Sequence, residues 1–213
     1  LTVAEPERGR TVVSAASLPF DTAAPASPAT VVVDSFAYGR KDLCLVWAAA
    51  SPNGLWQAVV SVVELRESKQ YRARVRLLDT ALHTRWCKDY ALKSMEQVCV
   101  TDCGEVVTLG CERVGDEQHL VFNIASGSRA ESYDVALECP PLIGLRLAGV
   151  VGRHVMAVGA FAPADSKPGK ERLAGVVGLS FQMDSAALTG ISLRALQYDD
   201  LCVLLNSKSG RKL

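Results

Sequence analysis

Three cysteines that lie close together in the sequence, Cys99, Cys103 and Cys111, come nearest to the spacing of a metal site, with His119 and Cys139 beyond them. A structural zinc site needs two closely spaced cysteine pairs, or a cysteine pair and a histidine pair. The stretch CVTDC supplies one such pair, and the sequence offers no second pair. We therefore predict no metal site and interpret these cysteines as small apolar residues on strands.

The same stretch indicates how its hairpin folds. If the chain turns at DCGE, we expect Thr108, rather than Cys111, to lie opposite Cys99. A disulfide that involves Cys103 stays open, because a turn position is accessible. The total of seven cysteines is odd, so at least one thiol is left over, and a chain this long and apolar does not need disulfides to fold.

No motif for catalysis stands out. His83, His119 and His154 occupy different places in the strand pattern and suggest no common set for proton transfer. The sequence has no G-x-S-x-G nucleophile elbow and no recognisable cysteine-protease context. No strand leads through G-x-G-x-x-G into a helix, so the dinucleotide fingerprint is missing as well. We therefore predict no catalytic residues and no cofactor.

The composition limits the class of protein. Of the 213 residues, 49% are hydrophobic and 22% are charged, which supports a packed core and excludes general disorder. The 23 basic residues balance the 23 acidic ones, so the basic surplus that is typical of nucleic-acid-binding proteins is absent. No apolar run approaches the roughly 18–20 residues that cross a bilayer as a helix. We expect neither a nucleic-acid partner nor a membrane span.

The chain changes character near Thr30. Residues 1–29 are rich in Ala, Ser, Thr and Pro, and prolines at 19, 25 and 28 remove backbone donors, so we predict a flexible leader or linker there. From Thr30 onward, apolar runs of about five to nine residues are bounded by Gly, Pro, Asn, Asp or Ser, the pattern of short strands. These runs include TVVVDSF, LCLVWAA, QAVVSVVEL, RARVRLLD, EVVTLGC, LVFNI, RHVMAVGAF and AGVVGLSFQMD. The predicted class is all-β.

A strand–turn–strand pattern recurs along this part of the chain. Its three copies are VRLLDTALHTRWCKDYAL (75–92), VFNIASGSRAESYDVAL (121–137) and LSFQMDSAALTGISLRAL (179–196). Another hairpin precedes each copy, with the turns SPNG (51–54), TDCG (101–104) and VVGR (150–153). The turn glycines Gly54, Gly104 and Gly152 follow one another at intervals of 50 and 48 residues. Four short strands in about 45–60 residues are typical of a β-propeller blade.

Stacked blades cover each other's apolar faces, which explains strands that are apolar on both sides. We predict blades over about 43–93, 95–139 and 144–197, with TVVVDSF closing an earlier blade and LCVLLNSKSG opening another. Because a ring usually has about four to eight blades, we expect the β-propeller-like domain over 30–213 to be part of a longer ring. Completion by partner molecules and a two-sheet β-sandwich are the alternatives.

Several of these motifs resemble one group of repeat proteins. SPNG before an apolar strand, LLDTALHTRWCKDYAL, VCVTDCGEVVTLG and HVMAVGAF before GVVGLSFQMDSAALTG are similar to six-bladed-type β-propellers of extracytoplasmic Bacteroidetes proteins, many of them uncharacterised. The resemblance covers roughly 43–197, but VVGR replaces the expected Asp-x-x-Gly turn and seven cysteines are many for this group. It implies an exported, periplasmic, surface-anchored or secreted protein with a binding or scaffolding role.

The sequence thus favours a non-enzymatic binding or scaffold module that recognises a protein or glycan partner through its turn loops. The contact residues that we predict, in the three turns and in the loop 162–172, are Asn53, Trp56, Asp102, Arg153, His154, Lys167 and Lys170. Sugars stack on aromatic faces, but we favour a structural role between blades for the tryptophans. The alternatives are a hydrolase or lyase with its active site at the propeller mouth, and a cytoplasmic propeller platform.

Overall fold

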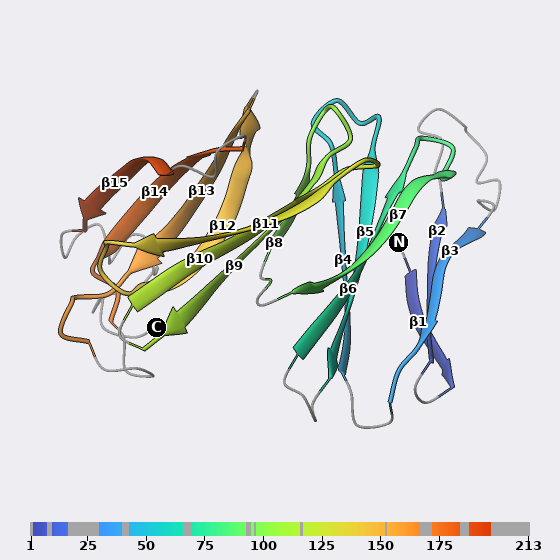
Figure 1. The fold of residues 1–213 in the computed structure, drawn as a ribbon, viewed down its shortest axis with the longest axis horizontal. Coiled ribbons are helices and arrows are strands. Elements are labelled where there is room, and N and C mark those ends of the chain that lie inside the picture. Colours follow the sequence, from blue (N-terminus) through green and yellow to red (C-terminus); the bar gives the residue numbers. More distant parts are fainter. Residues whose placement is uncertain are drawn as a thin grey trace, which may run out of the picture. The chain divides into compact units, whose positions relative to one another are not determined.

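The computed structural model describes residues 2–7, 10–16, 30–39, 43–65, 70–92, 95, 97–115, 117–151, 153–166, 172–183 and 188–196. All regular secondary structure within these ranges is β-strand, which confirms the all-β class (Figure 1). Within the described residues, no helix is present that is long and apolar enough to span a membrane.

The strands of the described residues form four sheets, which we name A to D. Sheet A contains β1 (Thr2–Glu7), β2 (Arg10–Ala16) and β3 (Thr30–Ala37). Sheet B contains β4 (Leu43–Ala50), β5 (Gln57–Leu65), β6 (Gln70–Leu78) and β7 (Thr84–Leu92). Sheet C contains β8 (Gln97–Val100), β9 (Val106–Val114), β10 (Glu117–Ala125) and β11 (Ala130–Leu137). Sheet D contains β12 (Leu142–Val151), β13 (His154–Phe161), β14 (Gly175–Gln182) and β15 (Leu188–Ala195).

In every sheet the strands pair in chain order, so each sheet is a meander of successive hairpins. Sheets B, C and D have four strands each and fall within the three predicted units to within a few residues. The turns at SPNG, TDCG and VVGR each join the first and second strands of a sheet, as the sequence predicts. The four-stranded units are therefore confirmed as sheets.

Two strands lie in the segment that the sequence assigns to a flexible leader, and the prediction is wrong for these residues. Strands β1 and β2 pair with each other, and β2 pairs with β3. The segment RTVVSAA of β2 buries alternate residues, Thr11, Val13 and Ala15, which is the period-2 pattern of a half-buried strand. The prolines at 19, 25 and 28, which suggested a leader, lie outside the described residues.

The register of the β8–β9 hairpin differs by one residue from the prediction. Cys99 lies opposite Val107, whereas Thr108 lies opposite Val98. The predicted register assumed a turn centred between Cys103 and Gly104. The observed turn has an odd number of residues, 101–105, closed by a hydrogen bond from Thr101 N–H to the Glu105 carbonyl oxygen at 2.9 Å. The extra residue shifts every pair of the hairpin.

The chain divides into two compact units. One contains Leu1–Leu109 and Phe122–Ser132, and the other contains Gly110–Val121 and Tyr133–Leu213. The division crosses β9, β10 and β11, so sheets A and B belong to the first unit and sheet D belongs to the second.

In the first unit, sheet B is covered on both faces. Alternate residues of its strands, among them Val60 and Val75, pack with Val100 and Val106 of sheet C in one apolar cluster. The opposite face contributes Val59, Leu78 and Leu82 to a second cluster with Val13, Ala15 and Val33 of sheet A. Burying one such aliphatic side chain completely stabilises the fold by roughly 1.5–3 kcal/mol. A two-sided core of this kind explains why QAVVSVVEL does not alternate cleanly between apolar and polar residues.

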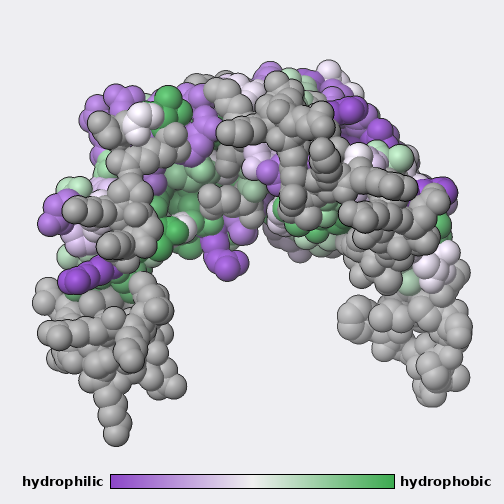
Figure 2. Space-filling view, turned by 90° about the horizontal axis from the view of Figure 1, so that it is seen from below, coloured by the Kyte–Doolittle hydropathy of each residue, from purple (hydrophilic) through white to green (hydrophobic). Residues whose placement is uncertain are grey.

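In the second unit, sheet D has a buried face and an exposed face. Val155, Ala157, Val177, Leu179 and Phe181 alternate along β13 and β14 and are almost completely buried. The residues that point to the other face of these strands include Met156, Val158 and Val176, whose exposed fractions are 41%, 50% and 38%. Hydrophobic residues also reach the surface between hydrophilic ones on the side drawn in Figure 2.

Candidate functional site

The β4–β5 turn, residues 51–56, is held closed by its own polar groups. Ser51 N–H donates to the Trp56 carbonyl oxygen at 2.9 Å, and Gly54 N–H donates to the Ser51 carbonyl oxygen at 2.9 Å. The Ser51 hydroxyl accepts from Trp56 N–H at 3.0 Å and donates to Asn53 Oδ1 at 2.7 Å. Asn53 Oδ1 also accepts from Leu55 N–H at 3.0 Å. Side-chain bonds to nearby main chain thus fix this turn.

The β8–β9 turn, residues 101–105, is built in the same way. Gly104 N–H donates to the Thr101 carbonyl oxygen at 3.0 Å, and Glu105 N–H donates to Thr101 Oγ1 at 3.0 Å. Thr101 therefore takes the place that Ser51 has in the first turn. Gly54 and Gly104 both adopt left-handed backbone, with φ of +71° and +76°, which glycine reaches at little energetic cost.

The two turns are joined by hydrogen bonds between Asp102 and the β4–β5 turn. Asn53 N–H donates to Asp102 Oδ1 at 2.9 Å, and Asn53 Nδ2 donates to the Asp102 carbonyl oxygen at 3.3 Å. The Trp56 indole N–H donates to that carbonyl oxygen at 3.1 Å. The tips of two neighbouring sheets are thereby held in one fixed arrangement.

In sheets B and C, the turn between the third and fourth strands lies at the same end of the sheet as the turn between the first and second strands. The reason is that alternate turns of an antiparallel meander share one end. In the β6–β7 turn, Asp79 Oδ1 accepts from Ala81 N–H at 3.0 Å and from His83 N–H at 2.9 Å. Leu82 has a φ of 63° and is buried in the cluster between sheets A and B. The polar end of this turn is thus anchored to the apolar core.

The β10–β11 turn, residues 126–129, connects to the β8–β9 turn through an ion pair. Arg129 Nη2 lies 3.3 Å from Glu105 Oε1, and Arg129 Nη1 lies 3.4 Å from Glu131 Oε2. The Ser126 hydroxyl accepts from Arg129 N–H at 3.2 Å. Residues 51–56, 79–83, 101–105 and 126–129 together form what we call the turn surface. All of it belongs to the first compact unit.

The turn surface presents both polar and apolar groups to solvent. Pro52, Asn53, Asp102 and Cys103 are exposed. Leu55 of the β4–β5 turn is an exposed large apolar side chain, with an exposed fraction of 53%. Because the polar groups of the turns are already engaged with one another, the surface is preorganised rather than adaptable.

The structure brings together three of the seven residues predicted for binding, namely Asn53, Trp56 and Asp102. Arg153 and His154 lie at the β12–β13 hairpin in the second unit. Lys167 and Lys170 lie outside the described residues, as does most of the second half of the loop 162–172. The three tryptophans, Trp47, Trp56 and Trp86, are partly buried and pack against the cluster between sheets B and C.

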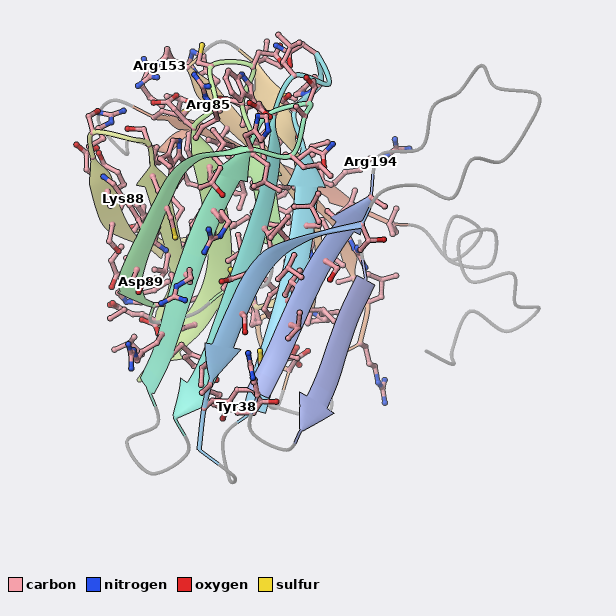
Figure 3. All side chains as sticks on the ribbon, turned by 90° about the vertical axis from the view of Figure 1, so that its right-hand side faces the viewer. Tyr38, Arg85, Lys88, Asp89, Arg153 and Arg194 are labelled. Carbon is pink, nitrogen blue, oxygen red and sulfur yellow. The ribbon has the colours of Figure 1, made fainter. Side chains whose placement is uncertain are left out.

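Charged residues between sheets A and B form a network that sequence reasoning did not identify. Asp34 of β3 is buried, and it accepts from the Ser61 hydroxyl at 3.1 Å and from Arg76 Nη2 at 3.2 Å. Arg74 lies 3.7 Å from Asp34 and binds Asp89 through two hydrogen bonds of 2.8 and 3.0 Å. Its guanidinium lowers the pKa of Asp89. In Figure 3, Asp89 and Lys88 follow Arg85 along β7.

A second polar cluster joins β10 and β11. His119 Nδ1 lies 2.7 Å from Asp134 Oδ1, and His119 Nε2 lies 3.5 Å from Glu117 Oε2. The hydrogen bond to Asp134 raises the pKa of His119. Across the described ranges, no set of three or more His, Cys, Asp and Glu side chains has the geometry to hold a metal ion.

The thiols of the described residues differ in their surroundings. Burial raises the pKa of Cys99 to about 12 and also raises the pKa of Cys139. Cys103 is exposed at the tip of the β8–β9 turn. Reactivity with electrophiles requires a thiolate, so these two partly buried thiols, with their raised pKa values, are poor nucleophiles.

No protein-family model matches this sequence, and no curated protein matches it.

Proposed function

We propose that this chain is a non-enzymatic binding module, that its sheets are blades of a β-propeller, and that a protein partner docks on the turn surface. The observation that carries the proposal is the interlock of Asn53 and Trp56 with Asp102, because it makes a rigid surface from loops of two sheets.

The covering of sheet B on both faces supports the propeller. A two-layer sandwich leaves one face of each sheet toward solvent, whereas blades in a propeller are covered by a neighbour on each side. Sheet B packs through one face on sheet A and through the other on sheet C. The order of four successive strands in sheets B, C and D is that of propeller blades.

The preorganised turns support binding. A loop that must be ordered on binding costs roughly 0.5–1.5 kcal/mol for each immobilised side chain. At the turn surface, Ser51, Thr101 and Asp79 already fix the main chain. Loops on a rigid scaffold are where binding residues concentrate.

The chemistry of the surface favours a protein over a glycan. The Trp56 indole N–H is engaged with Asp102, and the side chain packs against the apolar cluster, so little of its ring is free for a sugar. Leu55 remains as an exposed apolar anchor on a surface that also carries the charged pair of Arg129 and Glu105. An apolar centre with a polar rim is typical of protein interfaces.

The test is a selection with the full chain as bait. A display library of folded domains and a glycan array are screened, and recovered ligands are titrated against Leu55→Glu and Val114→Glu. Leu55 and Val114 have the same exposed fraction, 53%, but Val114 lies at the opposite end of β9 from the turn surface. We expect protein ligands that lose about tenfold or more in affinity with Leu55→Glu, about 1.4 kcal/mol, and bind Val114→Glu normally.

Two results would contradict the proposal. Glycans recovered in place of proteins would overturn the partner class. Turnover of a glycan, peptide or ester library, abolished by one substitution of an acidic residue or a histidine, would replace binding with catalysis.

We also propose that the protein works outside the cytoplasm, on the strength of its resemblance to extracytoplasmic propellers. Thiol titration of protein denatured without reductant, taken from its native source, tests this location. Seven free thiols would indicate a reducing compartment instead.

A further inference from the structure

We propose that Asn53 is a guarded deamidation site: the Asn53–Gly54 pair is stable while the turn surface is closed and reacts when it opens. The new carboxylate then faces Asp102 and keeps the two turns apart. The site would act as an irreversible record of opening, independent of which partner binds.

The chemistry needs only water. The Gly54 main-chain nitrogen attacks Asn53 Cγ, a new N–C bond forms, and the Cγ–Nδ2 bond breaks. Ammonia leaves, carrying the proton that the Gly54 nitrogen loses. Water then adds to either carbonyl of the resulting five-membered imide and leaves aspartate or isoaspartate at position 53. A following glycine favours the attack because it has no side chain and adopts many backbone conformations.

The folded turn holds every group that must move. Gly54 N–H is donated to the Ser51 carbonyl oxygen at 2.9 Å, so the nucleophile is engaged. The Asn53 side chain is fixed at both ends, through Oδ1 by Ser51 and Leu55 and through Nδ2 by the Asp102 carbonyl oxygen. The Asn53 main chain is fixed by Asp102 Oδ1 at 2.9 Å.

Hydrogen bonding, rather than burial, therefore protects Asn53 from deamidation. Asn53 is exposed, so water reaches it in the folded state. Asp102→Ala removes the Oδ1 acceptor of Asn53 N–H but keeps the main-chain carbonyl that accepts from Asn53 Nδ2. It should therefore loosen the main chain at Asn53–Gly54, whereas solvent access stays the same. Faster deamidation in this variant would thus result from lost hydrogen bonding and not from greater exposure of Asn53 to water.

The product cannot restore the closed turn. A carboxylate at position 53 has no N–H to donate to the Asp102 carbonyl oxygen, and it adds a negative charge beside the Asp102 carboxylate. Like charges in such proximity are destabilising. Isoaspartate also inserts an extra main-chain carbon, which the close Ser51 N–H to Trp56 carbonyl bond does not accommodate.

The experiment follows deamidation of the full chain at mildly alkaline pH by peptide mapping with mass spectrometry. Asn123 is the internal reference, because it is buried, precedes Ile124 and donates to Thr108 Oγ1 at 3.1 Å. The proteins are the wild type, Asp102→Ala and Asp102→Asn, each folded and in denaturant. Asp102→Asn keeps a side-chain oxygen that can accept from Asn53 N–H and is the matched control.

We expect folded wild type to deamidate at Asn53 at least about tenfold more slowly than denatured wild type, because only the locally open fraction reacts. Folded Asp102→Ala should react several-fold faster than wild type, and Asp102→Asn should stay near wild type. Amide hydrogen exchange is measured on the same samples. It should show faster exchange at Gly54 in Asp102→Ala while the β5 amides stay protected.

Either of two results would overturn the proposal. One is equal deamidation of folded and denatured wild type. The other is folded Asp102→Ala that exchanges its Gly54 amide quickly but deamidates at the wild-type rate. Should Asp102→Ala fail to fold, Ser51→Ala removes one Oδ1 donor from the same turn and carries the same expectations.

Discussion

Asp34 on β3 and Arg76 on β6 form an ion pair 3.2 Å long between sheets A and B, and the carboxylate is only 1% exposed. Ser61 donates to the other carboxylate oxygen at 3.1 Å. A buried charge is tolerated where it is paired and hydrogen-bonded, so this cluster fixes how the two sheets meet.

Loss of Asp34 should be far more damaging than loss of Asp89, although both carboxylates pair with Arg74. Asp34→Ala leaves two guanidinium groups without their buried partner and should lower the free energy of unfolding by about 3 kcal/mol. The Asp89 side chain is 51% exposed, so Asp89→Ala should lower it by about 1 kcal/mol or less. Urea titrations followed by tryptophan fluorescence compare the two. Equal losses would show that the Asp34 pair adds no more than a surface pair.

Substitutions at two turn glycines distinguish the cost of backbone strain from the cost of a steric clash. Gly54→Ala and Gly104→Ala both place a side chain on left-handed backbone, which costs about 1–2 kcal/mol. A Cβ at Gly54 meets open space, whereas one at Gly104 would lie 3.1 Å from Leu77 Cδ2 and 3.5 Å from the Trp56 ring. We expect Gly104→Ala to be the more destabilising by about 1 kcal/mol. Thermal unfolding measures the difference, and identical values would remove the packing contribution.

The pair of His119 and Asp134 should make the free energy of unfolding decrease as the pH rises. Asp134 raises the pKa of His119 above its ordinary value of 6.5, so the folded state binds the proton more tightly than the unfolded state. This contribution is fully present below pH 6.5 and is lost as pH rises through the folded pKa of His119. NMR titration of the His119 ring gives the pKa, and Asp134→Asn should lower it and flatten the stability profile. A His119 pKa below 6.5 in the wild type would contradict the assignment.

The thiols should react in an order set by their environment. Cys103 is exposed, whereas burial raises the pKa of Cys99 to about 12. At pH 8 an alkylating reagent should modify Cys103 well before Cys99 in folded protein, and the difference should disappear in denaturant. Mass spectrometry of quenched digests gives both rates. Early modification of Cys99 would mean that the β8–β9 hairpin opens readily.

The strands and their grouping could be predicted because their signals are local. QAVVSVVEL reads directly as β5, and the glycines of SPNG and TDCG mark turns where left-handed backbone is needed. The period of these turns predicted where sheets B, C and D lie along the chain.

The contacts of the candidate site could not be predicted, because they join residues far apart in the sequence. Asn53 and Asp102 are separated by 49 positions, and each alone is an ordinary turn residue. The buried pair of Asp34 and Arg76 did leave a signal. A lone acidic residue interrupts the apolar run TVVVDSF, and arginines alternate in RARVR. A charged residue in a strand that is otherwise apolar enough to be buried requires a partner of opposite charge.

The two-sided burial of sheet B makes its strands intolerant of any shift along their length. Val75 and Leu77 face sheet C, whereas Arg74 and Arg76 face sheet A. Inserting one residue early in β6 would exchange the faces on which the apolar side chains and the arginines lie. Both guanidinium groups would then point into the apolar cluster between sheets B and C, and Asp34 would face valine and leucine. We therefore expect sheet B to tolerate insertions only in its hairpin turns. The buried ion pairs constrain the lengths of its strands as strongly as the apolar core does.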